Sequence, residues 1–453
     1  MPITRLLLGA TVLAMVLSLL ANSVAYAQVL PRGERDAIRG ARVLPRATGA
    51  QELPRGAEDV PRGETVTTRQ RLEVNPLGMR VGGFLLFPKL SLDETYDDNI
   101  FRVEDDADHD FITVLRPEFA LRSDWNNHAF NIQGDAAVGR FARSEKENFE
   151  DFNIDTDGRF DVTRNIFLFG SLGYSQRHED RGSPDDAGGV VPTEYEVFRG
   201  SARYFHQLNR VSFRLDAAAL KFDFDDVSTG PLSDPTNNDD RDRLEADVTL
   251  RAAYEIVPEY EAFVRASGNN IAYRTAVDDN GFGRDSQGYE IVGGVAIDLG
   301  GIAFGDFFAG FREQRFDDEN LDTIGGITWG ADITWNITGL TTLQAGIVRR
   351  VEETTSGGSS GFFATRYSLS ADHELLRNLL LNANVAFTQN DYEGIKREDQ
   401  IYEAGFGARY FLNRNFYASA SYTYTQRERV DGAPGDDADY KQNVVTVRLE
   451  LQM

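Results

Sequence analysis

Apolar and polar side chains alternate along residues 243–256, and this alternation constrains the fold more than any other feature. Apolar residues occupy the even positions from Leu244 to Ile256, while the odd positions from Arg243 to Glu255 are mostly charged or polar. Successive side chains of a strand point to opposite faces, whereas a helix would mix the two sets on every side. The same period recurs in residues 152–163, 211–219 and 327–336. These runs predict long strands with one apolar and one polar face.

The length of these strands indicates a membrane barrel. Strands of an ordinary sandwich have ~5–6 residues, whereas a tilted strand needs ~9–11 residues to cross the hydrocarbon. Lipid admits only helices and closed barrels, because every backbone N–H and C=O must be paired within the protein. No apolar run after Leu20 reaches the length of a spanning helix, and 26% of residues are charged. A barrel tolerates this composition because only alternate side chains face lipid.

The N-terminal 27 residues are predicted to be a secretory signal peptide. Arg5 precedes an apolar run that ends at Leu20, and Ala25-Tyr26-Ala27 has the small-x-small pattern of a cleavage site. The run is short for the ~20 residues of a spanning helix, so we expect cleavage after Ala27. The chain contains no cysteine, which excludes a disulfide scaffold and a cysteine-linked lipid anchor. The protein is therefore expected in a bacterial envelope.

Residues 28–80 differ in composition from the rest of the mature chain. They contain four short repeats of the Leu/Val-Pro-Arg type and carry ten arginines against seven acids, whereas residues 81–453 carry 36 basic and 65 acidic residues. One interpretation is a disordered periplasmic leader kept open by proline and glycine. The other is that the basic repeats bind something acidic, such as the lumen of the barrel or a periplasmic polymer.

Short and long connections alternate along residues 81–453, which we interpret as the barrel. Nine longer acidic or glycine-rich links separate eight tight turns, which fall at residues 124–127, 163–165, 207–210, 257–259, 299–301, 336–339, 376–378 and 412–415. This pattern predicts an all-β, antiparallel up-and-down barrel of about 18 strands, or 16 if the first hairpin is misread. Bacterial barrels have short periplasmic turns, longer external loops and an even strand number. We therefore expect both chain ends in the periplasm.

The stretch Asn75–Phe101, "NPLGMRVGGFLLFPKLSLDETYDDNIF", resembles the opening of the putative β-barrel porin family of bacterial outer-membrane proteins. In that family a Pro-Leu-Gly-like step leads into the first strand, which ends in Tyr-Asp-Asp-Asn. Tyr96 then lies where an aromatic girdle is expected. The resemblance implies an outer-membrane barrel, and some relatives accompany exopolysaccharide production. It implies no catalytic residues.

The inward-facing strand positions carry charges of both signs. The candidates for lumen-lining residues are Asp155, Asp157, Arg159, Arg203, Arg214, Asp216, Arg243, Glu245, Arg251, Glu261, Arg265, Arg366, Glu403 and Arg409. Barrels of this size enclose an aqueous channel unless they are plugged. One hypothesis is a porin-like channel for small hydrophilic solutes, with a mild cation preference from the excess of acids. In the alternative the charges pair into ladders that stiffen the wall, and the barrel serves exopolysaccharide export or acts as a scaffold.

Other functions receive weaker support from the sequence. The acidic runs near residues 105–110, 239–242 and 436–439 could bind Ca²⁺ or Mg²⁺ and bridge to lipopolysaccharide, but they are more often plain solvated surface. The Gly-x-Ser-x-Gly match at residues 357–361 falls in a loop rather than at a strand-to-helix elbow, and His178 is the only rim-sited candidate for a hydrolase. No catalytic residue, metal or cofactor is therefore assigned. The expected partners are outer-membrane lipid and lipopolysaccharide, the barrel insertion machinery, and a periplasmic or polysaccharide partner of residues 28–80; nothing suggests nucleic acid.

Overall fold

The computed structural model describes residues 63–183, 188–230, 235–352, 354, 358–431 and 439–453. Its chain forms one antiparallel sheet in which each strand pairs with its neighbour in sequence. The strands are β1 (Met79–Val81), β2 (Phe84–Asp97), β3 (Asp110–Ser123), β4 (Ala129–Phe141), β5 (Phe149–Thr163), β6 (Ile166–His178), β7 (Glu194–Leu208), β8 (Val211–Phe224), β9 (Arg243–Val257), β10 (Tyr260–Tyr273), β11 (Ser286–Asp298), β12 (Ala303–Phe316), β13 (Ile324–Thr338), β14 (Thr341–Glu352), β15 (Gly361–Leu376), β16 (Leu379–Glu393), β17 (Glu398–Phe411), β18 (Phe416–Asp431) and β19 (Tyr440–Gln452). Two single-turn 3₁₀ helices, η1 (Glu145–Glu147) and η2 (Asp239–Arg241), lie in the connections.

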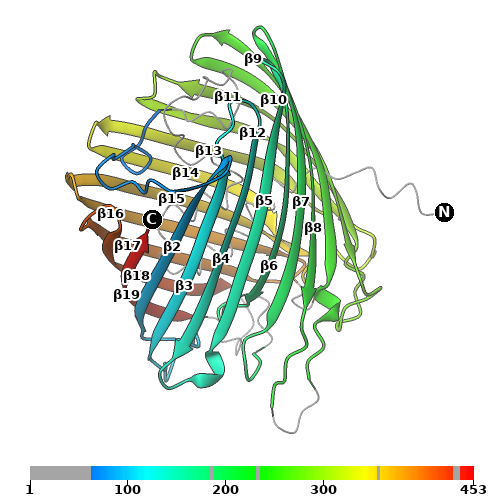
Figure 1. Cartoon of the computed structure of the whole chain (residues 1–453). Helices are drawn as coiled ribbons and strands as arrows, with labels where there is room; N and C mark the ends of the chain where they lie inside the picture. The colour runs from blue at the N-terminus through cyan, green and yellow to red at the C-terminus, as the bar shows by residue number, and fades with distance from the viewer. Residues whose placement is uncertain (1–62, 184–187, 231–234, 353, 355–357, 432–438) are drawn as a thin grey trace.

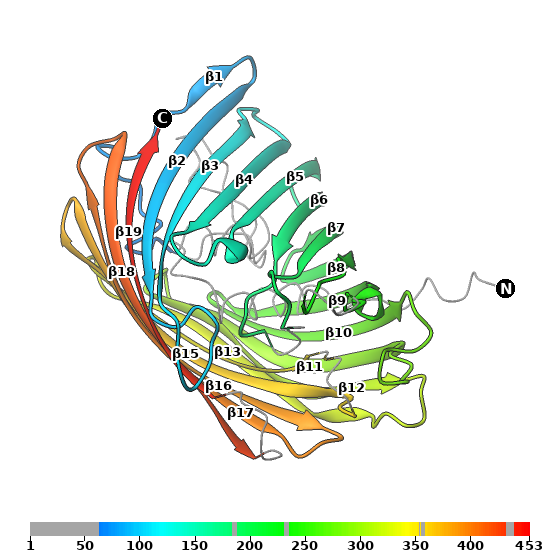
Figure 2. The ribbon, with the colours of Figure 1, turned by 90° about the horizontal axis from the view of Figure 1, so that it is seen from below.

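The sheet closes into a barrel because β19 pairs with β2, from Val444 opposite Asp97 to Gln452 opposite Lys89. Figure 2 shows red β19 directly beside blue β2, with the remaining strands completing the ring. The barrel therefore has eighteen strands, β2 to β19, which confirms the predicted fold class. The additional strand, β1, pairs only with the start of β2.

All connections of one kind lie at one end of the barrel (Figure 1). We call the end with the eight tight turns the turn end and the opposite end the loop end. Residues with left-handed backbone angles form several tight turns, including Asn209 (φ 55°), Glu259 (φ 78°) and the adjacent Gly300 and Gly301. The C-terminus also lies at the turn end, where the Met453 N–H donates to the Pro88 carbonyl. Among the described residues, no helix is long and apolar enough to cross a membrane.

The predicted alternation gives the barrel an apolar outer face and a polar inner face. On β9, Leu244 and Leu250 are 48% and 50% exposed, whereas Glu245 and Arg251 are 1% and 3% exposed. Small apolar clusters also lie among the inward-facing side chains toward the loop end. One of them joins Val197, Leu220, Phe222 and Phe224 on β7 and β8. The polar interior therefore becomes partly apolar near the loops.

One neighbouring pair of strands separates toward the loop end. Among the described residues, the β13–β14 ladder ends at Gly330 opposite Val348, although β13 continues to pair with β12 as far as Ile324. The Thr328 hydroxyl donates to the Arg349 carbonyl at 3.0 Å across this gap. Ile324 packs there with side chains of β14 and β15. Side-chain contacts thus replace backbone hydrogen bonds between β13 and β14 near the loop end.

The last part of the expected disordered leader has a defined position, which differs from the prediction. Residues 63–75, the docked segment, lie against the turn end. The Val66 N–H donates to Thr342 Oγ1 at 3.0 Å, Arg71 forms a buried ion pair with Glu374 at 2.9 Å, and Gln452 Nε2 donates to the Val74 carbonyl at 3.0 Å. The alternation used to predict strands gives no signal for such a segment, because its contacts are made with residues distant in sequence. Residues 28–62, including most of the basic repeats, lie outside the described residues, as do the residues of the expected signal peptide.

Candidate functional site: the charged interior of the barrel

All fourteen candidate residues lie on the strands β5, β7, β8, β9, β10, β15 and β17, and none of them is exposed. They occupy positions that alternate with apolar residues of the outer face. In a closed barrel this arrangement directs them toward the interior. The structure brings most of them into pairs and small clusters, and it adds partners that the sequence analysis did not select.

The densest cluster lies on β7 and β8. Arg203 on β7 and Arg214 on β8 both donate to the carboxylate of Asp216, which is 5% exposed. The Arg214 Nε–Asp216 Oδ2 distance is 2.7 Å. Two guanidinium groups therefore share one carboxylate, and the cluster has a net positive charge.

Further pairs continue around the wall on β9 and β10. Arg243 donates to Glu245 at 2.8 Å along β9, and Arg251 donates to Glu261 on β10 at 2.7 Å. The Arg251 guanidinium also lies over the ring of Phe263, 4.2 Å from its centroid. The ring covers one face of the cation while the carboxylate accepts from its edge.

Glu290 on β11 is an inward-facing acid that was not among the candidates. Its carboxylate accepts a hydrogen bond from Arg265 at 3.0 Å, and Arg312 on β12 lies 3.2 Å from its other oxygen. Glu290 alternates with outward-facing residues in the same way as the chosen candidates. The period-two pattern could therefore have identified it.

The acids of β5 have a different environment. Asp155 accepts from Arg199 at 3.0 Å, Asp157 accepts from the Asn131 amide at 2.9 Å, and Arg159 donates to Asp161 at 2.8 Å. Asp135 on β4, which accepts from the Asn153 amide, is exposed although it lies on the inner face. This part of the interior is therefore open to water.

The remaining candidates lie on β15 and β17. Arg366 forms an ion pair with Glu403 at 2.5 Å and donates to Thr388 at 2.9 Å. Arg409 lies over the ring of Tyr417, with 5.4 Å between the guanidinium carbon and the ring centroid. Cations and carboxylates therefore occur around the whole circumference of the inner wall.

Several loops are held together over part of the loop end by ion pairs. The β6–β7 connection contributes Glu179, which accepts two hydrogen bonds from Arg241 of η2, and Arg181, which donates two to Glu147 of η1. Arg427 on β18 donates to the Gly182 carbonyl at 3.4 Å. The described part of this connection thus joins the neighbouring loops to a strand more than a quarter of the way around the barrel.

Two loop carboxylates titrate away from their ordinary range. Hydrogen bonds from the backbone N–H groups of Asn320 and Gly283 hold the pKa of Asp318 below its ordinary value. Burial raises the pKa of Asp242, although hydrogen bonds from the Phe224 N–H and from Arg274 oppose that shift. Within the described ranges, no group of three His, Cys, Asp or Glu side chains is arranged to hold a metal ion.

The residues that suggested a rim-sited hydrolase make separate contacts. The Ser359 hydroxyl oxygen lies 3.1 Å from the Gly361 carbonyl and 3.0 Å from the Glu393 carbonyl, either of which can accept its single proton. The His178 ring pairs with Asp151 at 2.9 Å and stacks on Phe149. These contacts hold the ends of strands and the loops between them.

A family comparison identifies this architecture. The family model described as "Putative beta-barrel porin 2" matches residues 74–453. The chain belongs to this family. The match confirms the resemblance seen at Asn75–Phe101, and it places the protein among porin-like barrels of the outer membrane.

Several solved outer-membrane proteins are similar to this chain at low sequence identity. OpdK from Pseudomonas aeruginosa is 12% identical, with a TM-score of 0.43 and coverage of 81% of this chain and 99% of that chain. OpdO from the same organism is 11% identical, with a TM-score of 0.43 and coverage of 82% and 98%. A mutant of the ferric enterobactin receptor PfeA from Pseudomonas aeruginosa is 9% identical, with a TM-score of 0.44 and coverage of 81% and 80%. A comparison with curated protein sequences gives no match.

Proposed function

We propose that this protein is a passive outer-membrane channel for small hydrophilic solutes, with its turn end in the periplasm and its loop end outside the cell. The observation that carries the proposal is the closed ring of eighteen strands whose inner wall holds charges of both signs. A barrel of this strand number encloses an aqueous lumen. Paired charges keep that lumen polar at a lower cost than isolated ones.

Ion pairing and solute passage are compatible in this wall. Pairs such as Arg203–Asp216 stiffen the strands that bear them, and Asp135 shows that water reaches part of the same face. A polar solute can exchange hydrogen bonds with such a wall as it moves. The loops joined through Glu179 and Arg181 would set the narrowest part of the route.

Single-channel recording in a planar bilayer tests this function. The mature chain should show steady openings, and a chain that lacks residues 28–62 should show the same conductance. This truncation retains the docked segment, so that the barrel contacts of residues 63–75 are unchanged. Silence in both forms would contradict the channel.

A second candidate is a barrel that works with a polysaccharide export system. The docked segment supports it, because the basic leader enters the structure at Gly63, next to Gly301 in a tight turn at the mouth of the barrel. Ten arginines in residues 28–80 suit an anionic polymer. Openings that occur only after removal of residues 28–62, or retention of an anionic polysaccharide that depends on them, would favour this function.

A further inference from the structure

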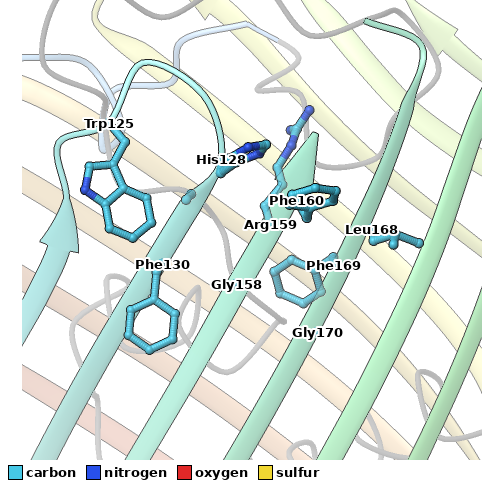
Figure 3. Close-up of a pocket in the computed structure, with 10 residues that line it drawn as sticks. Trp125, His128, Phe130, Gly158, Arg159, Phe160, Leu168, Phe169 and Gly170 are labelled. Atoms are coloured by element: carbon cyan, nitrogen blue, oxygen red, sulfur yellow. The ribbon is translucent and has the colours of Figure 1, made fainter. Parts of the chain in front are cut away.

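The outer face of the barrel contains a hollow at the turn-end half of β4, β5 and β6. This open depression has a volume of about 460 Å³ and is lined by side chains that include Trp125, Phe130, Phe160 and Leu168. Figure 3 shows Trp125 and His128 near the turn, Phe130 on one side, and the bare backbone of Gly158 and Gly170 between Phe130 and Leu168. A second cavity of about 350 Å³ shares Phe130 and both glycines and extends to Leu172. The two form one continuous groove.

The glycines of the groove are not required by the fold. At two other strand glycines an aromatic ring fills the space: a β-carbon added at Gly134 would lie 2.6 Å from the Phe119 ring, and one at Gly294 would lie 2.3 Å from the Phe263 ring. At Gly158 and Gly170, which are opposite each other in the β5–β6 ladder, the nearest atom would be 3.7 Å away. Neither has a positive φ. The Phe130 ring lies beside Gly158, with one ring atom 3.7 Å from such a β-carbon, but it does not occupy the position of the missing side chain as the rings at Gly134 and Gly294 do.

We propose that this groove binds one acyl chain of a phospholipid. The groove lies on the apolar outer face that meets lipid in an outer-membrane barrel, and its rim side chains are substantially exposed, from 37% for Phe130 to 66% for Leu172. Trp125 marks its turn end, and tryptophan favours the membrane interface. An acyl chain lying in the groove would have its headgroup at that level.

The geometry favours an acyl chain over a second copy of the protein. Neighbouring strands are ~4.8 Å apart. The floor formed by Gly158 and Gly170 on adjacent strands is therefore about as wide as one acyl chain. A stable protein interface needs ~800 Å² of surface from each partner, with matched shapes. The side chains of Phe160 and Leu172 project beside the glycines, and a flat protein surface could not contact both the projections and the glycines between them. An acyl chain that leaves the bilayer for the groove gains no hydrophobic free energy, because both environments are apolar. The free energy of binding would instead come from van der Waals contact with the rigid side chains of the groove.

The choice of phospholipid rests on the proposed orientation. With the turn end in the periplasm, the groove opens into the periplasmic leaflet, which is built of phospholipid. Lipopolysaccharide occupies the other leaflet.

Photo-crosslinking in lipid nanodiscs tests the site. The probe is a phosphatidylethanolamine with a diazirine in its acyl chain, and adducts are located by peptide mass spectrometry. Adducts on Phe130, Phe160 and Leu168 should exceed those on Ile291 and Val295, which face lipid on β11, by several-fold. The double variant Gly158→Val with Gly170→Leu should reduce the groove adducts to the level of β11.

Matched variants separate filling of the groove from damage to the barrel. Gly293→Val adds a side chain to the outer face of β11, where a β-carbon would meet only the Phe263 carbonyl at 4.0 Å. This variant should leave the groove adducts unchanged. Gly158→Ala with Gly170→Ala is a milder filling pair and should cause a partial loss. Heat-dependent gel mobility confirms that each barrel has folded.

Four results would overturn the proposal. Three are equal labelling around the barrel, groove labelling that survives in the filled variant, and a filled variant that changes only the oligomeric mass. The fourth is labelling by a lipopolysaccharide probe but not by the phospholipid, which would also contradict the proposed orientation. A silent channel with intact groove adducts would contradict solute passage while supporting the lipid site.

Discussion

Asp93 and Arg448 join the first and last strands of the barrel. Arg448 donates to the Asp93 carboxylate at 2.5 and 2.7 Å, and Asp93 is 1% exposed. The same carboxylate accepts from Arg116 on β3 at 2.9 Å. One buried acid therefore ties together β2, β3 and β19, where the ring closes.

Asp93→Asn should destabilise the barrel by ~3–5 kcal/mol, because the buried guanidinium of Arg448 and the partly buried one of Arg116 would both lose this carboxylate. Urea unfolding of detergent-solubilised protein, followed by tryptophan fluorescence, measures the change. Lys221→Gln is the control, since Lys221 pairs with Asp223 at the surface with 54% of its side chain exposed, and exposed pairs contribute less than ~1 kcal/mol. Equal midpoints for the two variants would contradict a special role for Asp93.

Glu374→Gln should loosen the docked segment without changing its sequence. The buried Arg71 would lose its ion pair at 2.9 Å, and the backbone around Arg69 and Arg71 would then become accessible to trypsin. We expect faster cleavage at these arginines, measured by mass spectrometry over a digestion time course. Asp124→Asn, which removes the exposed partner of Arg80, should not accelerate cleavage there. An unchanged rate in Glu374→Gln would show that the other contacts suffice to hold the segment.

Amide exchange should be faster at the gap between β13 and β14 than in the ladders beside it. Backbone amides that no ladder protects exchange through smaller fluctuations. In hydrogen–deuterium exchange, peptides that cover residues 349–352 of β14 should take up deuterium sooner than peptides that cover residues 362–365, their partners on β15. Uniform protection across β12 to β15 would mean that the ladder is complete in the membrane.

Asp318 should keep its charge at a pH where ordinary aspartates protonate. Its folded pKa lies below the ordinary value of 3.8 because it accepts from the N–H groups of Asn320 and Gly283. Its contribution to stability is therefore present above about pH 3.8 and is lost as the pH falls through the lower, folded pKa. A carboxyl-carbon NMR titration should give a midpoint below 3.8, and Asp318→Ala should increase amide exchange at Gly283 at neutral pH. A midpoint at or above 3.8 would contradict this assignment.

Charge on the inner wall should set the ion selectivity of the proposed channel. Asp135→Asn with Asp157→Asn removes two carboxylates from the β4–β5 wall, and should shift the reversal potential in a salt gradient toward anion passage. The control, Asp105→Asn with Asp106→Asn, changes two exposed loop acids, and its effect should be smaller and lost at high salt. A larger shift in the control would place the selectivity in the loops.

Much of the fold could be predicted from the sequence because the period-two pattern is local. The alternation at residues 243–256 indicates a strand with one polar face whatever its neighbours are. The spacing of tight turns then gives the strand number, and the structure confirms eighteen. The same pattern selects residues such as Asp216 and Glu261 for the polar face.

The partners of those residues could not be predicted in the same way. Which cation meets Asp93 depends on the register at which β19 closes against β2, and Arg448 lies 355 residues away. Glu290 and Arg312 fit the pattern but were not selected, because alternation alone gives no rank among many inward charges. The docked segment has no periodic signal, since Val66 and Arg71 are held by strands that follow hundreds of residues later.

The docked segment also imposes an order in time on assembly. Its contacts are with Thr342, Glu374, Arg414 and Gln452, all in the second half of the chain. Residues synthesised and exported early can therefore take their final place only after the last strand has arrived. The docked segment therefore binds to the turn end late in assembly, and its protection from protease would indicate that the barrel has closed.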